Sequence, residues 1–141
     1  MSASAFYDTN VLVYAHDGSS PRKQGRAQEL IKRGLRERTM VLSTQVFSEY
    51  YVVATRKLGL DEVSVLRELH LFSSTHIVEP TLAMVFKSIG LSRSDRVSYW
   101  DALIAVSAAA AGCTTLYTED LSHGEEIAGV HVVNPFLEAS M

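Results

Sequence analysis

The sequence predicts an α/β domain in which helices cover both faces of a short, mainly parallel sheet. Short apolar runs of strand length alternate with longer segments that have helical periodicity. The chain of 141 residues is long enough for one domain and too short for two, so we expect residues 1–141 to form one unit. A hydrophobic fraction of 47% against 21% charged residues indicates a globular protein with a substantial core.

The chain begins with strand and helix signals in alternation. Residues 5–7 are apolar and lead through Asp8 into a turn and a short helix. Residues 21–38 have helical spacing, and their apolar stripe consists of Ala27, Leu30, Ile31 and Leu35. Residues 40–43 form a second apolar run, typical of a buried strand.

Capping residues mark the next two helices. One starts at a cap on Ser43 or Thr44 and ends after Leu58, because Gly59 is a residue type that stops helices. Asp61 caps the following helix. The residues of that helix expected to face inward are Val65, Leu66, Leu69 and Phe72.

Residues 77–97 contain a short strand candidate, a helix and a loop. Ile77 and Val78 form a strand candidate. Pro80 suits the first turn of a helix, which we expect to end near Gly90. Residues 93–97 then predict a polar loop.

The most apolar helix of the chain follows Ser98. Residues 99–111 are apolar on nearly every side, which predicts a helix in the middle of the molecule that ends at Gly112. Residues 115–117 and 130–133 are the last two strand candidates, separated by a loop rich in acids and glycine.

Composition excludes several classes of protein. A single cysteine, Cys113, cannot build a disulfide framework or a cysteine-rich zinc site, and we expect it to be a buried, unreactive thiol. The longest near-apolar run, residues 102–111, is too short to cross a bilayer. The N-terminus lacks the basic region of a signal peptide. We therefore expect a cytoplasmic protein without membrane attachment.

The net charge of −3 conceals an uneven distribution. A cluster of bases lies on one predicted helix: Arg22, Lys23, Arg26, Lys32, Arg33, Arg36 and Arg38. Beyond residue 96 the chain has no lysine or arginine but carries these acids: Asp101, Glu119, Asp120, Glu125, Glu126 and Glu138. The bases could grip a polyanion, or they could form an ordinary solvated helix face.

Asp8 and Asp101 each stand at the predicted start of a helix. Asp8 follows a strand directly, so it is either a helix cap or part of a site at the strand end. Asp101 lies three residues after Ser98, which is the spacing of a capping box. At the start of a buried helix the dipole and backbone N–H groups keep a carboxylate ionised, a state that suits a metal ligand.

Glu49 is the least expected of the acids. Its predicted helix face is shared with apolar residues, namely Val46, Val52 and Val53. An unpaired buried charge is costly, so Glu49 is expected to bind a cation, to have a raised pKa or to pair with Arg56.

The adjacent acids Glu119 and Asp120 directly follow the strand at residues 115–117. The carboxyl ends of parallel strands share one edge of a sheet, so these acids should lie near Asp8, although they could also be solvated turn residues. Packed carboxylates repel one another unless a cation neutralises them. Oxygen ligands without cysteine or histidine favour Mg²⁺ or Mn²⁺, ions that activate water for phosphodiester hydrolysis.

Four segments, in order along the chain, resemble the motifs of PIN-domain ribonucleases. They read DTNVLVYA at 8–15, STQVFSEYYVVAT at 43–55, SYWDALI at 98–104 and LYTEDLSHG at 116–124. The closing VVNPF at 132–136 is also similar to family members. The resemblance implies a PIN domain-like α/β/α sandwich with a short, mainly parallel central sheet.

Among PIN domains the chain most resembles the VapC-type toxins of type II toxin–antitoxin modules. This implies a homodimer that hydrolyses structured RNA, such as tRNA or rRNA, with water activated by Mg²⁺ or, in its place, Mn²⁺. It also implies inhibition by a cognate antitoxin protein. The metal-binding and catalytic roles carry over to Asp8, Glu49, Asp101 and Asp120.

Supporting roles follow from the same resemblance. Asn10 and Thr118 would orient the water around the ion, and Glu119 is the substitute for Asp120 as the fourth acid. Our own candidates for RNA contacts, which the resemblance does not supply, are Arg22, Lys23 and Arg26.

Two alternative functions stay open. The segment Asp8-Thr9-Asn10 after a strand weakly resembles haloacid-dehalogenase phosphatases, but that family has a second aspartate where Asn10 stands. The chain could also be a degenerate PIN scaffold that binds RNA or a protein partner without catalysis, although a scaffold has no need of convergent acids.

We expect the remaining conspicuous side chains to be structural. His123 lies in an exposed loop and is more often inert in such a place than catalytic. Tyr99 and Trp100 favour a place in the core or a dimer interface over stacking on a base. A packing role is also expected for Phe47, Tyr50 and Tyr51.

Overall fold

The computed structural model describes residues 3–94 and 97–137, and its sheet confirms the predicted α/β architecture. The strand order is β3-β2-β1-β4-β6-β5, with every neighbouring pair parallel except β5 and β6. The strands are β1 (Ala5–Tyr7), β2 (Met40–Ser43), β3 (His76–Val78), β4 (Thr115–Tyr117), β5 (Glu126–Ile127) and β6 (Val130–Val133).

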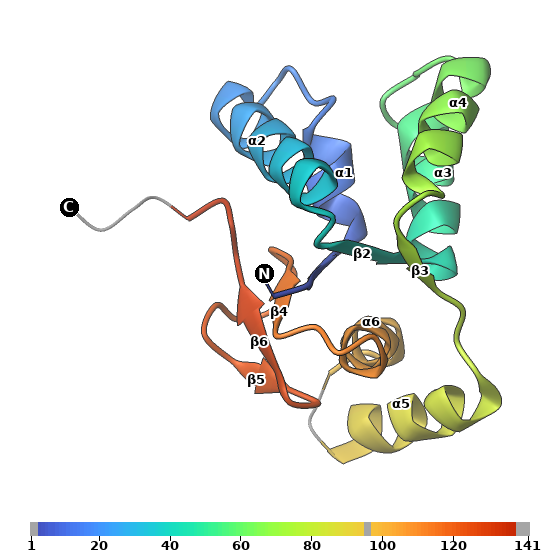
Figure 1. Ribbon diagram of the computed structural model, residues 1–141, viewed down its shortest axis with the longest axis vertical. Coiled ribbons are helices and arrows are strands. Elements are labelled where there is room, and N and C mark those ends of the chain that lie inside the picture. Colours follow the sequence, from blue (N-terminus) through green and yellow to red (C-terminus); the bar gives the residue numbers. More distant parts are fainter. Residues whose placement is uncertain (1–2, 95–96, 138–141) are drawn as a thin grey trace.

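Helices cover both faces of this sheet. They are α1 (Thr9–Tyr14), α2 (Pro21–Glu37), α3 (Thr44–Arg56), α4 (Glu62–Phe72), α5 (Leu82–Ser94) and α6 (Tyr99–Ala110). Helices α1 to α4 lie on one side, and α6, with α5 packed outside it, lies on the other (Figure 1). As predicted, α6 is buried along most of its length. In the described part of the chain no helix combines the length and apolarity needed to cross a membrane.

The predicted caps set most helix boundaries. The side chains of Ser43, Asp61 and Ser98 each accept a hydrogen bond from the backbone N–H three residues further on, at the starts of α3, α4 and α6. Gly59 and Gly112 follow α3 and α6 with φ of 65° and 75°, a conformation that favours glycine.

Helix α5 differs from its prediction at both ends. The hydroxyl of Thr81 accepts a hydrogen bond from the backbone N–H of Met84 (3.2 Å), so the helix starts at Leu82 and Pro80 precedes it. At the other end α5 continues through Gly90 to Ser94. The predicted loop at 93–97 therefore begins inside the helix, and its residues 95–96 lie outside the described part of the chain, as does Glu138.

Two leucines expected in the core are exposed. Leu35 is 40% exposed because Gly34 takes the buried position, where α2 approaches the ring of Tyr7 closely. Leu66 is 52% exposed, and the buried stripe of α4 is narrower than expected, consisting of Val65, Leu69 and Phe72.

The sequence analysis missed β5, which lies in the loop between β4 and β6. It is only two residues long and pairs with β6 through a turn at Ala128 and Gly129. Both turn residues have positive φ, 54° and 82°, as two-residue hairpin turns require.

The order of the strands determines where a ligand would bind. From β1 the sheet extends to β2 on one side and to β4 on the other, so the order reverses between β1 and β4. In open parallel sheets ligands bind beyond the carboxyl ends of the strands at such a point. Here those ends lead directly into Asp8 and Thr118.

Candidate metal centre

Three of the predicted acids meet at the point where the strand order reverses. Asp8, Asp101 and Asp120 each offer a carboxylate oxygen within 4.8 Å of the others. Asp8 is buried, Asp101 is half-buried and Asp120 is exposed, so the cluster is open on one side. The structure thus brings together the ends of β1 and β4 and the start of α6, as the sequence analysis expected.

Thr118 connects the strand ends through one buried hydroxyl. It donates a hydrogen bond to Asp8 Oδ2 (2.8 Å) and accepts from the backbone N–H of Asp120 (3.0 Å) and from Asn10 Nδ2 (3.1 Å). Asn10 Nδ2 also donates to Asp120 Oδ2 (3.2 Å). Asp8 Oδ1 meanwhile accepts from the N–H of Thr9 (2.7 Å), so Asp8 is both the cap of α1 and a member of the cluster.

The environment disfavours negative charge at two of these acids. Burial raises the pKa of Asp8 to about 7, against the lowering effect of the hydrogen bonds from Thr118 and Thr9. Burial also raises the pKa of Asp101, with a contribution from Asp120, although Ser98 lowers it. At Asp101 desolvation therefore outweighs the lowering effect of the N-terminal hydrogen bonding. A cation between the carboxylates would oppose both rises.

Glu49 lies at the margin of the cluster and not in the core. The buried stripe of α3 consists of Val46, Tyr50 and Ala54. Glu49 precedes Tyr50 by one residue, so it lies beside this stripe, and it is exposed. The predicted apolar face is therefore wrong, and Val52 is 45% exposed. Among the described residues Glu49 forms no ion pair with Arg56. Partial desolvation, with Asp101 and Asp120, raises the pKa of Glu49.

Glu119 has different partners from its neighbour Asp120. Its Oε1 accepts a hydrogen bond from the hydroxyl of Tyr14 (2.5 Å), and its Oε2 forms an ion pair with Lys23 Nζ (2.9 Å). Lys23 also lies 4.7 Å from the ring centroid of Tyr14. The geometry therefore selects Asp120 over Glu119 for the cluster.

The three bases suggested for RNA differ in their surroundings. Lys23 is held by Glu119, and Arg26 donates to the backbone oxygen of Pro135 (3.1 Å) and pairs with Glu29 (3.3 Å). Arg22 is exposed on the first turn of α2. Two of the three thus have intramolecular partners that any RNA would have to share.

Buried oxygens without a partner surround the acids. In the described part of the chain these include Asn10 Oδ1 and Gln45 Oε1. Hydrogen bonding by the side chains of Gln45 and Thr9 lowers the pKa of Glu49, against the effect of desolvation. Asn10 contacts Asp120. Sequence reasoning missed Thr9 and Gln45, although both lie within the motifs. Buried polar atoms are rarely left unpaired, and water around a cation would supply a donor for Asn10 Oδ1 beside Asp120, so the donor set fits Mg²⁺ or Mn²⁺.

The aromatic residues divide between core and surface. Tyr50 is fully buried and Phe47 half-buried, as expected for packing, whereas Tyr51 is 37% exposed. Trp100 is 62% exposed, so it does not lie in the core, and its alternative place in a dimer interface stays a prediction. The half-buried ring of Tyr99 meets it edge to face, with the ring centroids 5.0 Å apart.

His123 lies in an exposed loop and Cys113 is buried, as predicted. The Nδ1 atom of the exposed His123 accepts a hydrogen bond from the backbone N–H of Asn134 (3.1 Å). Cys113 is buried, and burial raises the pKa of its thiol to about 11, which keeps it protonated and unreactive.

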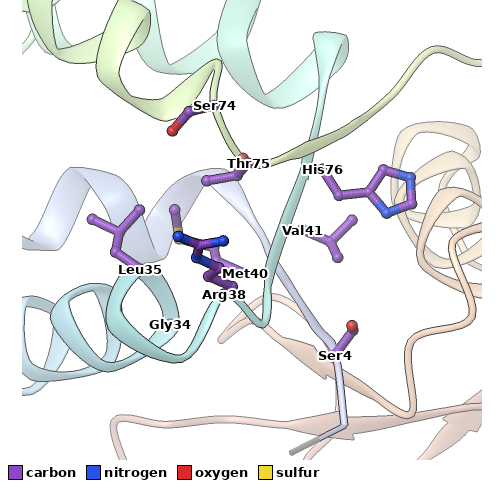
Figure 2. Close-up of a pocket in the computed structure, with 9 residues that line it drawn as sticks. All are labelled: Ser4, Gly34, Leu35, Arg38, Met40, Val41, Ser74, Thr75 and His76. Atoms are coloured by element: carbon purple, nitrogen blue, oxygen red, sulfur yellow. The ribbon is translucent and has the colours of Figure 1, made fainter. Parts of the chain in front are cut away.

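A separate cavity lies at the opposite edge of the sheet. It has a volume of about 500 Å³ and lies between the end of α2 and the residues that precede β1 and β3 (Figure 2). Its lining includes Ser4, Met40 and His76, which are near the amino ends of their strands. The acids follow the carboxyl ends, so this cavity is remote from the acid cluster.

Solved structures similar in fold come from toxin–antitoxin systems. A toxin–antitoxin complex from Klebsiella pneumoniae has 21% identity and a TM-score of 0.69, covering 94% of this chain and 98% of that one. VapC20 from Mycobacterium tuberculosis, a Sarcin-Ricin loop cleaving toxin, has 20% identity and a TM-score of 0.65, covering 83% and 90%. VapBC2 from Rickettsia felis, bound to a DNA fragment from its promoter, has 21% identity and a TM-score of 0.62, covering 91% and 96%.

The family itself is shown by sequence. No curated protein matches the chain in sequence. The family model of the PIN domain, however, matches residues 5–125, which include all four acids of the predicted metal site. The match covers most of the chain and agrees with the strand order and with the fold of the similar structures. The chain belongs to the PIN domain family.

Proposed function

We propose that this PIN domain is a metal-dependent endoribonuclease and the toxin of a type II toxin–antitoxin module. The observation that carries the proposal is the convergence of Asp8, Asp101 and Asp120 on one point at the sheet edge. Such a set of like charges is costly without a cation, and burial has already raised the pKa of Asp8. Membership of the PIN family supports the same reaction class.

The three aspartates would hold Mg²⁺, or Mn²⁺ in its place, with Glu49 at the margin. When bound, the ion would supply the Lewis acidity that phosphodiester hydrolysis by water requires. Thr118 fixes the rotamer of Asp8 through its hydroxyl, and Asn10 fixes that of Asp120. The open side at Asp120 leaves room for a phosphate to approach.

The partners we propose are structured RNA as substrate, a cognate antitoxin and a second copy of the chain. The similar VapC20 is described as a Sarcin-Ricin loop cleaving toxin, and the similar Klebsiella protein was solved as a toxin–antitoxin complex. An exposed apolar stripe on α5 supports a homodimer, and it consists of Leu82, Phe86 and Ile89. A cytoplasmic location follows from this role.

The test is cleavage of a mixed tRNA and rRNA substrate by the purified, antitoxin-free protein. Mg²⁺ and Mn²⁺ should each support discrete fragments, and EDTA should prevent them. Asp101→Asn should remove the activity, because it deletes a negative ligand while keeping the side chain's shape. Glu37→Gln, a change at an exposed acid on α2, should leave the activity intact. Equal cleavage by wild type and Asp101→Asn would identify a contaminating nuclease, whereas no cleavage by the folded wild type with either ion would contradict the proposal.

The scaffold alternative makes a different prediction in the same assay. Folded protein that binds RNA but never cleaves it, with either metal, would favour the degenerate scaffold. The cost of bringing three carboxylates together speaks against that outcome.

A further inference from the structure

A groove beside the acid cluster is lined by Glu49, which lies at the margin of the proposed metal site, and by four residues outside that site. Its volume is about 440 Å³, within the range of small-molecule sites, and its walls are Thr44, Gln45, Ser48, Glu49 and Trp100. The first four come from the start of α3 and the last from the start of α6. The groove therefore lies between α3 and the start of α6, the helix that carries Asp101.

The groove adjoins the proposed reaction centre. Glu49 lines it and also interacts electrostatically with Asp101 and Asp120. Trp100, on the opposite wall, immediately precedes Asp101 in α6. A chain of nucleotides whose phosphate reached the acids would thus bring an adjacent base to this groove.

The lining combines an aromatic face with an unsatisfied acceptor. The exposed side chain of Trp100 is braced by the edge-to-face contact with Tyr99. Gln45 donates from Nε2 to the backbone oxygen of Trp100 (3.5 Å), while its buried Oε1 has no partner in the described part of the chain. Stacking on an aromatic ring together with a hydrogen bond to the base edge is how proteins bind unpaired bases.

We propose that this groove, which we call the Trp100 groove, binds one unpaired nucleobase of the RNA next to the scissile phosphate. The base stacks on Trp100, and an N–H group on its edge donates to Gln45 Oε1. Base pairs in a helix cannot enter, so the groove selects loops and bulges in structured RNA. This inference rests on the proposed nuclease function and adds a determinant of which RNA is cut.

Trp100 is the single tryptophan of the chain, so its fluorescence reports on the groove directly. The probe is a single-stranded 2′-O-methyl RNA octamer of mixed sequence, in Mg²⁺ buffer, checked on a denaturing gel to be intact. The control is an octamer with the same number of phosphates but no bases. Anisotropy of a terminal dye measures binding independently of Trp100.

The base-containing octamer should quench Trp100 and the abasic octamer should not. Loss of one stacked base corresponds to about a 5- to 150-fold weaker Kd, which we expect for Trp100→Ala, whereas Trp100→Phe should keep most of the affinity. Gln45→Leu should weaken binding with the tryptophan still quenched. Because Trp100 is exposed, circular dichroism of Trp100→Ala should match that of wild type.

Several results would overturn the assignment. Three concern the RNA: an unchanged tryptophan spectrum when anisotropy shows saturation, equal quenching by the abasic strand, or no binding at all. The fourth is a blue-shifted tryptophan spectrum of the free protein, caused by burial of Trp100 against a second copy of the chain. The cleavage assay separates this failure from failure of the nuclease proposal. Cleavage without a role for Trp100 would refute the groove alone, and quenching without cleavage would refute the nuclease alone.

Discussion

Glu119 and Asp120 are adjacent in sequence, yet their carboxylates have opposite surroundings. Glu119 is bound by Tyr14 and Lys23, whereas Asp120 lies with Asp8 and Asp101. The backbone N–H of Asp120 donates to Thr118, which fixes the direction of the loop at this point. A step of one residue in sequence thus separates a structural ion pair from the proposed metal ligand.

This pair gives a prediction with a built-in control. Loss of a residue that only hydrogen-bonds to a metal ligand weakens metal binding by about 10- to 100-fold. Asp120→Asn should weaken Mn²⁺ binding by more than this, because Asp120 is itself a proposed ligand. Glu119→Gln should leave the affinity unchanged, because its carboxylate lies outside the cluster. Electron paramagnetic resonance of free Mn²⁺ measures both constants. The reverse order of effects would mean that Glu119 is the fourth acid.

Much of the site could be predicted from residue types and spacing. Asp8 and Asp120 follow strands, and parallel strands end at one edge, so their proximity followed from the pattern. The partners of Lys23 could not be predicted, because Glu119 lies 96 residues away in sequence. The exposure of Trp100 was missed for a similar reason, since it depends on which face of α6 meets the sheet.

At the scale of elements, α2 carries two glycines with opposite roles. A Cβ atom on Gly34 would lie 2.5 Å from the hydroxyl of Tyr7 and 3.1 Å from Met40 Cβ. Tyr7 cannot move freely, because its hydroxyl donates to the backbone oxygen of Leu30 (2.8 Å) inside the core. A Cβ on Gly25 would have nothing within 4 Å.

Alanine at these two positions should therefore change stability in opposite directions. Gly34→Ala should lower the free energy of unfolding by about 1–3 kcal/mol through overpacking. Gly25→Ala should raise it by about 0.5–1 kcal/mol, because alanine is the better helix former. Urea unfolding monitored by circular dichroism measures both. A stabilised Gly34→Ala would show that α2 does not lie as close to β1 as described here.

Another contact between elements makes stability depend on pH. Glu68 of α4 pairs with His16, which follows α1 (Nε2 to Oε2, 2.8 Å), and accepts a hydrogen bond from Tyr50 of α3. The hydrogen bond to Glu68 raises the pKa of His16 above 6.5. Burial raises the pKa of Glu68, but the hydrogen bonds from His16 and Tyr50 bring it below 4.5 overall.

The pair should stabilise the fold most between about pH 4.5 and 6.5. The His16 contribution is present below pH 6.5 and lost as pH rises through the folded-state pKa, while that of Glu68 is present above pH 4.5 and lost as pH falls. Wild type should exceed His16→Gln in free energy of unfolding by up to about 1 kcal/mol at pH 5.5, because the pair is partly solvent-screened. The difference should shrink at pH 8.5. A constant difference would mean that His16 contributes by packing alone.

At the scale of the whole molecule, the fold was more predictable than its contacts. Short apolar runs and helix caps located every strand longer than two residues, and β5 was missed because two residues carry no periodicity. The strand order, which makes the edge beyond β1 and β4 a ligand site, is a property of the assembled sheet. No local pattern encodes this order, so the sequence analysis did not predict it.

The assembled acid cluster predicts that a divalent ion stabilises the entire domain. An ion that binds only the folded state at 100 times its Kd adds about 2.7 kcal/mol, which corresponds to roughly 5–10 °C in Tm for a domain of this size. Mn²⁺ should produce such a rise in wild type and none in Asp120→Asn. Calorimetry with and without the ion measures it, and an equal shift in both proteins would indicate nonspecific binding.

The central claim is that Asp8, Asp101 and Asp120 hold a divalent cation, and anomalous diffraction from crystals containing Mn²⁺ tests it most directly. The account predicts a manganese peak bordered by these three carboxylates, with Thr118 still bonded to Asp8 and with Glu119 still paired with Lys23. A cluster without a peak, in crystals where no neighbouring molecule covers it and the ion is in excess, would contradict the claim.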